Sequence, residues 1–139
     1  MKALKTLIRL HKKQLDDLLK KINNLEEQKN QLELTLQKLE DEAARELEQY
    51  CGGQYAFMLE KYLKNAENRR QELFSRINKI KEQIQLLRNE LHNKFAELKK
   101  FEIALQNYLN KEQKLLKAAE TKFLDEFNTN QFTLKQAKE

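Results

Sequence analysis

The chain has 139 residues, 35% of them charged, with a mean hydropathy of −0.89, no proline and no tryptophan. Its richness in Lys, Glu, Leu, Gln and Asn is typical of long helices and coiled coils, and it argues against a layered globular domain. The longest apolar run, residues 55–59, is too short to span a membrane, and residues 1–5 lack a signal-peptide core, so we expect a cytoplasmic protein.

The net charge of +5 is distributed in blocks along the chain. Residues 1–21 carry +5, residues 22–54 carry −5, residues 55–100 carry +5, and residues 101–139 are neutral. The acidic stretch 22–54 is followed by the basic stretch 55–84, which favours pairing of these two segments across a helix interface.

The first predicted helix covers about residues 3–50 and carries a continuous heptad repeat. Steps of four and three residues keep one side of a helix facing a partner, which indicates a left-handed coiled coil. The polar residues His11 and Lys29 occupy interface positions, where buried polar groups specify register. The predicted interface positions are Leu4, Ile8, His11, Leu15, Leu18, Ile22, Leu25, Lys29, Leu32, Leu36, Leu39 and Ala43.

A turn is predicted at residues 51–54, because Gly52 and Gly53 are the only glycines in the chain. Glycine adopts left-handed backbone conformations that end one helix and release the next. The alternative is one continuous helix with a weak point, since two interior glycines cost only about 2 kcal/mol. The single cysteine, Cys51, excludes an intrachain disulfide and leaves an intermolecular one open.

The second predicted helix covers about residues 55–128, and residues 129–139, which lose the apolar pattern, are expected to be frayed or disordered. Its interface positions run from Leu73 to Ala119 with polar interruptions at Lys94 and Glu112, and strict register extends them backward through Arg70 to Ala56. Folding at the glycines places His11 near Lys94 and Phe95. The fold class is therefore all-α, a long antiparallel two-helix coiled-coil hairpin whose second helix is longer than the first.

Two exposed apolar features follow from this arrangement. From Ile103 onward the second helix has no partner within the chain, although it stays amphipathic, which favours binding of another protein. Strict register also leaves an outward stripe near the turn that resembles a docking surface, formed by Tyr55, Met58, Tyr62, Asn65 and Arg69. A shifted register would instead bury Tyr55, Leu59, Tyr62, Ala66 and Arg69.

The sequence carries no pattern of residues for catalysis. It lacks a glycine-rich phosphate loop, has one serine (Ser75), and spreads its carboxylates over helix surfaces. We expect no enzyme activity, no cofactor, no metal site and no small-molecule substrate. Basic pairs such as Lys12-Lys13 and Arg69-Arg70 leave a nucleic-acid-associated hairpin as an alternative, although acidic residues interleave with them and no aromatic stacking platform is present.

The segment 6–10, Thr-Leu-Ile-Arg-Leu, followed by a leucine interface with Lys and Asp, resembles the start of the flagellar export protein FliJ family. The spacing of Tyr55, Tyr62, Arg69-Arg70 and Leu73 is similar to that family's second helix. YscO-type stalk proteins of virulence secretion systems are similar in architecture. A general coiled-coil adaptor remains a further alternative.

The resemblance implies a stalk-like component of the type III export apparatus, located near the membrane through its partners. Such proteins insert into the export ATPase ring, link it to the export gate, and in some cases escort substrate chaperones. Gly52 and Gly53 would form the turn, and the stripe of Tyr55, Met58, Tyr62, Asn65 and Arg69 would face the gate. The residues implied to face the ring are Leu4, Leu7, Ile8, Arg9, Leu105, Tyr108, Leu109, Leu115 and Leu116.

Overall fold

The computed structural model describes residues 1–138, with side-chain exposure described for residues 1–136. Two helices make up this part of the chain: α1, Lys2–Tyr50, and the longer α2, Ala56–Lys138. No strand occurs in the described residues. The predicted all-α hairpin with a longer second helix is confirmed, and the absence of proline explains the length of both helices.

The turn lies between Tyr50 and Ala56. Gly52 has a φ of +77°, the left-handed conformation that L side chains rarely adopt, and no other described residue has a positive φ. The Cys51 N–H donates to the Leu47 carbonyl at 3.1 Å, and the Ala56 N–H donates to the Gly53 carbonyl at 3.2 Å. These hydrogen bonds end α1 and start α2, with α2 beginning one residue after the predicted position.

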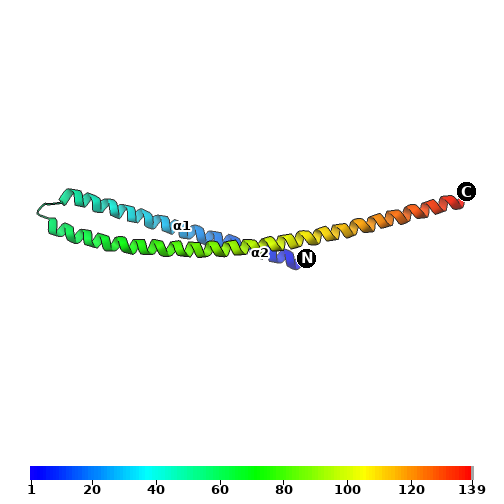
Figure 1. Cartoon of the computed structure of the whole chain (residues 1–139), viewed down its shortest axis with the longest axis horizontal. Coiled ribbons are helices and arrows are strands. Elements are labelled where there is room, and N and C mark those ends of the chain that lie inside the picture. The colour runs from blue at the N-terminus through cyan, green and yellow to red at the C-terminus, as the bar shows by residue number, and fades with distance from the viewer. Residues whose placement is uncertain (139) are drawn as a thin grey trace. The chain divides into compact units, whose positions relative to one another are not determined.

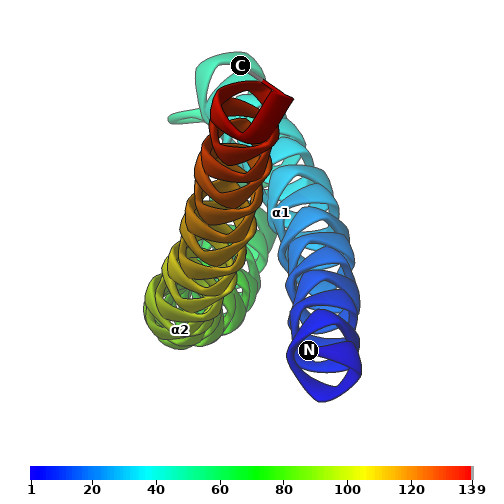
Figure 2. The same cartoon turned by 90° about the vertical axis from the view of Figure 1, so that its right-hand side faces the viewer.

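The contacts between residues divide the chain into two compact units. The turn unit comprises Lys13–Phe95, and the terminal unit comprises Met1–Lys12 with Ala96–Glu139. Within the turn unit, α1 and α2 run antiparallel and side by side, as the cyan and green ribbons show in Figures 1 and 2.

The core of the turn unit follows the predicted heptads. Leu18 and Ile22 of α1 and Leu73, Ile77 and Ile84 of α2 are the buried apolar residues. Leu15, Leu25, Lys29, Leu32, Leu36, Leu39 and Ala43 of α1 are half-buried, as are Leu59, Leu63, Ala66, Ile80, Leu87, Leu91 and Lys94 of α2. Half-burial of so many interface residues is expected when only two helices cover each other.

Ion pairs join the acidic and basic blocks across this interface. Arg70 contacts Glu40 at 3.2 Å, and Arg88 pairs with Glu26. The predicted pairing of oppositely charged segments therefore includes specific ion pairs. Each ion pair contributes modest energy because its side chains are largely solvated.

In the terminal unit, residues 1–12 pack on the first turns of the α2 segment that begins at Ala96. Ile8 and Leu98 are buried, whereas Leu4, Phe101 and Leu105 are half-buried. From 106 to 136 every side chain is exposed. The uncovered part of α2 thus begins after Leu105 and not at Ile103, the predicted position.

Within the terminal unit, His11 contacts the α2 segment that begins at Ala96. Its ring nitrogens lie 2.9 Å from the Leu7 carbonyl and 3.2 Å from Glu97, and its ring packs edge-on against Phe101. Lys94, its predicted neighbour, donates to Gln14 at 3.2 Å. In such an interface the interleaving side chains set the register, and each side chain packs between residues a turn apart on the partner helix.

Two further expectations differ from the structure. Arg70, at an interface position in strict register, keeps 47% of its side chain exposed, because its guanidinium reaches solvent-side carboxylates. Residues 129–138 are helical, whereas a frayed or disordered tail was expected. Nothing in that segment breaks a helix, and intrahelical hydrogen bonds do not require an apolar pattern. Glu139, the last residue of the expected tail, lies outside the described residues.

Candidate partner-binding surfaces

The outward stripe near the turn has the predicted composition and exposure. Tyr55, Met58 and Tyr62 are 51%, 67% and 37% exposed, and Asn65 and Arg69 are also exposed. The interface side of the same turns consists of the half-buried Leu59, Leu63 and Ala66. Strict register therefore applies from Leu59 to Ala66, whereas Ala56, which strict register also placed in the interface, is exposed. The shifted register does not apply, because Tyr55 and Arg69 are exposed.

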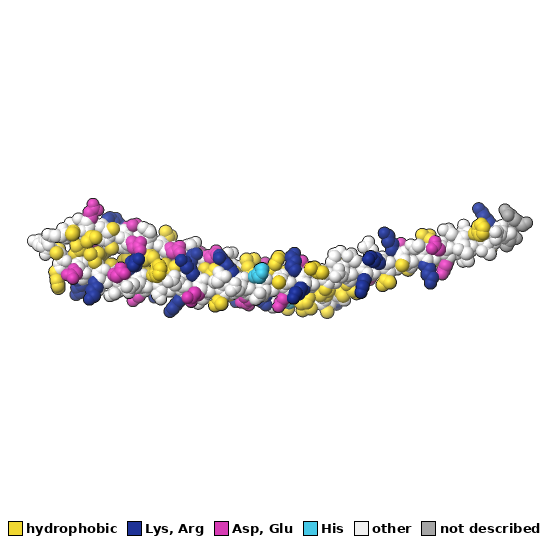
Figure 3. All heavy atoms as spheres, in the orientation of Figure 1, with side chains coloured by type: hydrophobic (Ala, Val, Ile, Leu, Met, Phe, Trp, Pro, Cys, Tyr) yellow, Lys and Arg dark blue, Asp and Glu magenta, His cyan; other side chains and the backbone are white. Residues whose placement is uncertain are grey.

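Tyr55 and Met58 also form part of a groove between the ends of the two helices, which we call the tip groove. It has a volume of about 460 Å³ and is lined by Glu46, Tyr50, Tyr55, Met58, Leu59 and Tyr62. Figure 3 shows hydrophobic side chains gathered at this end of the turn unit. Glu46 and Tyr50 were not predicted from the sequence as part of a binding surface. The only signal for them was the loosening of the heptad pattern after Ala43, because side chains beyond that point no longer follow the interface of α1.

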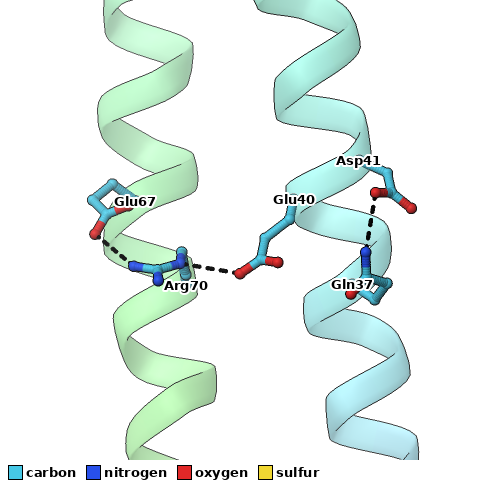
Figure 4. A network of polar contacts seen from close by, with 5 residues as sticks. All are labelled: Gln37, Glu40, Asp41, Glu67 and Arg70. Atoms are coloured by element: carbon cyan, nitrogen blue, oxygen red, sulfur yellow. Dashed lines mark hydrogen bonds and ion pairs between the residues drawn. The ribbon is translucent and has the colours of Figure 1, made fainter.

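A network of polar contacts around Arg70, the residue after Arg69 of the stripe, joins α1 to α2 (Figure 4). The Arg70 guanidinium donates to Glu40 across the interface and to Glu67 on its own helix, each at 3.2 Å. The hydrogen bond that Arg70 donates to Glu40, followed by the charge of Glu67, raises the pKa of Arg70 above its usual value. Arg70 links the two helices through this contact, while Arg69 remains exposed on the stripe.

The residues implied to face the ATPase ring fall into two groups in the terminal unit. Leu4, Ile8 and Leu105 pack in the interface, and Ile8 is only 8% exposed. By contrast, Leu7 and Arg9 are exposed on the N-terminal segment. The uncovered residues of α2 are Tyr108 and Leu109, each 42% exposed, Leu115 at 72% and Leu116 at 61%.

The exposed apolar residues continue along α2 beyond this set. Leu109, Leu116 and Phe123 recur at intervals of seven, and Phe127 follows one turn later, so these four side chains share one face of the helix. Leu105, one turn before Leu109, lies on the same face and packs in the interface. We call the exposed residues the terminal stripe: Tyr108, Leu109, Leu115, Leu116, Phe123 and Phe127.

The polar groups of the described residues do not form a chemical centre. No cluster of His, Cys, Asp and Glu there is arranged to hold a metal ion. Within residues 1–138, neither helix contains a stretch apolar enough for a membrane span. The exposed apolar side chains of the two helices are therefore the candidate binding features, and such side chains suit protein partners.

A two-helix hairpin with solvent-exposed apolar stripes is an architecture of helical adaptor and stalk proteins. The family model described as Flagellar FliJ protein matches residues 1–137, and the chain belongs to this family. Neither the comparison with curated proteins nor that with solved structures gave a match. Family membership makes the chain a flagellar export-related protein, in a family of non-catalytic components that act with protein partners.

Proposed function

We propose that this protein is a non-enzymatic stalk and chaperone component of the flagellar type III export apparatus. It docks in the export ATPase ring through its terminal unit, and it contacts the cytoplasmic part of the export gate through the turn unit. It acts at the cytoplasmic face of the membrane through these partners. The observation that carries the proposal is the continuation of helix α2 past Leu105 with an uncovered apolar face.

The terminal stripe supports docking in a socket. Leu115, Leu116 and Phe123 each expose more than 60% of their surface on a helix without a cover in the terminal unit. Burying such side chains against a partner is favourable by roughly 25 cal/mol per Å² of apolar surface. The same helix is anchored by Leu98 and Ile8, so the stripe is presented on an element that other contacts already hold.

The N-terminal segment adds charge to this surface. Its Lys2, Lys5 and Arg9 are exposed close to the exposed Leu7. A basic rim around an apolar patch accelerates capture by an acidic partner surface and makes the rate of association sensitive to salt. Ile8 and Leu4 support the segment from the interface, so their substitution affects docking through stability.

The gate-facing role rests on the stripe of Tyr55, Met58, Tyr62, Asn65 and Arg69. Tyrosine, methionine and arginine are enriched at the centres of protein interfaces, where they contribute most of the binding energy. The Arg70–Glu40 contact holds the two helices together beside the stripe, so a partner meets a preformed surface.

The test measures stimulation of the purified export ATPase by the full-length protein. We expect Leu109→Ala with Leu116→Ala to lower stimulation about thirtyfold, which corresponds to losing a hot spot of about 2 kcal/mol. The matched control is Leu34→Ala with Leu86→Ala, two leucines exposed to 63% and 68% outside the terminal stripe. Both variants should keep the helical circular dichroism of the parent.

Equal stimulation by the two double variants would contradict ring docking through the terminal stripe. A parent protein that neither binds nor stimulates the ATPase would reject the ring-docking function altogether. Gate contact is measured separately, by binding of the isolated cytoplasmic part of the gate to the parent and to Tyr62→Ala.

A further inference from the structure

The tip groove has a composition that an apolar docking surface does not require. Three tyrosines, Met58 and Leu59 line it together with one carboxylate, that of Glu46. Among the described residues Glu46 forms no ion pair. A carboxylate that lines an aromatic groove without a cation of its own chain is complementary to a cation from elsewhere.

The aromatic side chains are arranged to surround such a cation from more than one direction. The rings of Tyr50 and Tyr55 lie with centroids 6.2 Å apart and planes at 87°. Both remain solvent-accessible, with 37% and 51% of their surfaces exposed. Ring faces attract cations through their quadrupole, and rings at right angles are how proteins enclose a positively charged group.

The charge around the groove points to the same class of ligand. Residues 46–62, which span the residues lining the groove, contain three acidic residues and one basic residue, a net charge of −2, although the whole chain carries +5. A basic segment is therefore attracted to this end of the turn unit, whereas an acidic one is repelled. The groove of about 460 Å³ has room for one long side chain entering from a bound segment.

We infer that the tip groove binds an arginine side chain presented by a basic segment of a partner protein. The guanidinium stacks on the tyrosine rings and donates hydrogen bonds to the Glu46 carboxylate. Arginine fits better than lysine because its planar, weakly hydrated head group both stacks and pairs with a carboxylate. The inference deepens the gate-facing half of the proposed function, and it rests on that function only for the identity of the partner.

The test uses the full-length protein and its two methionines, Met1 and Met58, labelled with ¹³C at the methyl groups. The probe is a capped pentapeptide, Gly-Gly-Arg-Gly-Gly, and its matched control carries citrulline, which keeps the shape of arginine without the charge. We expect the arginine peptide to shift the Met58 signal saturably, to leave Met1 unchanged, and to bind about threefold or more tightly than the citrulline peptide.

Substitutions separate the groove from general electrostatics. Glu46→Gln and Tyr55→Leu should each weaken binding of the arginine peptide about threefold, with Tyr62→Leu as a second aromatic variant if Tyr55→Leu alters helicity. Glu48→Gln removes the same charge from an exposed position outside the groove and should change affinity less than twofold.

Three results would overturn the inference: no Met58 shift, equal binding of the citrulline peptide, or equal effects of Glu46→Gln and Glu48→Gln. The outcome is distinguishable from that for the proposed function. Gate binding without peptide binding rejects arginine recognition alone, whereas peptide binding without gate binding rejects the gate-facing role alone.

Discussion

Replacing Gly52 by alanine tests whether backbone conformation at one residue controls the reversal of the chain. A methyl group added at Gly52 would meet no atom within 4 Å, so the substitution introduces no clash. The φ of +77° remains, and that conformation costs an L residue about 1–2 kcal/mol. We therefore expect Gly52→Ala to lower the free energy of unfolding by up to about this amount, since restriction of the unfolded chain by alanine offsets part of the backbone strain.

Gly53→Ala is the matched control, one residue away in the same turn. Its added methyl group would lie 3.7 Å from the Tyr50 carbonyl oxygen, an ordinary van der Waals contact, and its φ is not in the left-handed range. Substitution there should be neutral or stabilise by about 0.4–1 kcal/mol, because alanine restricts the unfolded chain. Gly52→Asn should recover part of the loss, since asparagine tolerates the left-handed region better than alanine.

Urea unfolding followed by circular dichroism at 222 nm measures all three variants. If backbone strain is the cause, Gly52→Ala unfolds at a lower midpoint urea concentration than Gly53→Ala, and both show the same slope of free energy against urea concentration. If Gly53→Ala were equally destabilising, steric crowding of the turn would be the cause and not the sign of φ. If neither variant changed the midpoint, the turn would not limit the stability of the hairpin.

Three further outcomes are expected. Ile77→Ala, at a residue only 3% exposed, should lower the free energy of unfolding by about 2–5 kcal/mol, whereas Leu86→Ala, at a residue 68% exposed, should change it by less than about 0.5 kcal/mol in urea titrations. Arg70→Gln should lower the melting temperature more at low than at high salt, because its contacts are largely solvated. Tyr62→Ala should weaken gate binding while lowering the melting temperature less than Leu63→Ala, since Leu63 faces the interface.

The heptad positions show how much of this fold local sequence determines. Leu18, Ile22, Ile77 and Ile84 are buried where steps of four and three residues place them, because that spacing keeps one face of a helix toward a partner whatever the partner is. The turn is determined in the same way, since only glycine adopts the conformation of Gly52 at little cost.

The alignment of the two helices against each other could not be predicted from the sequence to the residue. A heptad repeat is satisfied by several alignments that differ by whole turns, and interleaving of side chains selects one of them. His11 contacts Glu97 and Phe101, two residues that the heptad pattern did not single out as its partners. The same selection places Leu105 inside the interface and leaves Leu109 outside it.

For the candidate surfaces too, some features follow from local sequence and others only from the tertiary structure. Sequence alone determined that the chain forms an antiparallel helical pair with a longer second helix, because helical periodicity is a local property. It left two registers open for the stripe, and the exposure of Tyr55, Met58 and Tyr62 in the structure selected one of them. Only the tertiary structure brought Glu46 and Tyr50 of α1 beside those residues of α2, since a groove between two helices depends on their register and on the path of the turn. The ligand chemistry inferred for the tip groove therefore follows from the packing of the two helices and is not contained in either helix by itself.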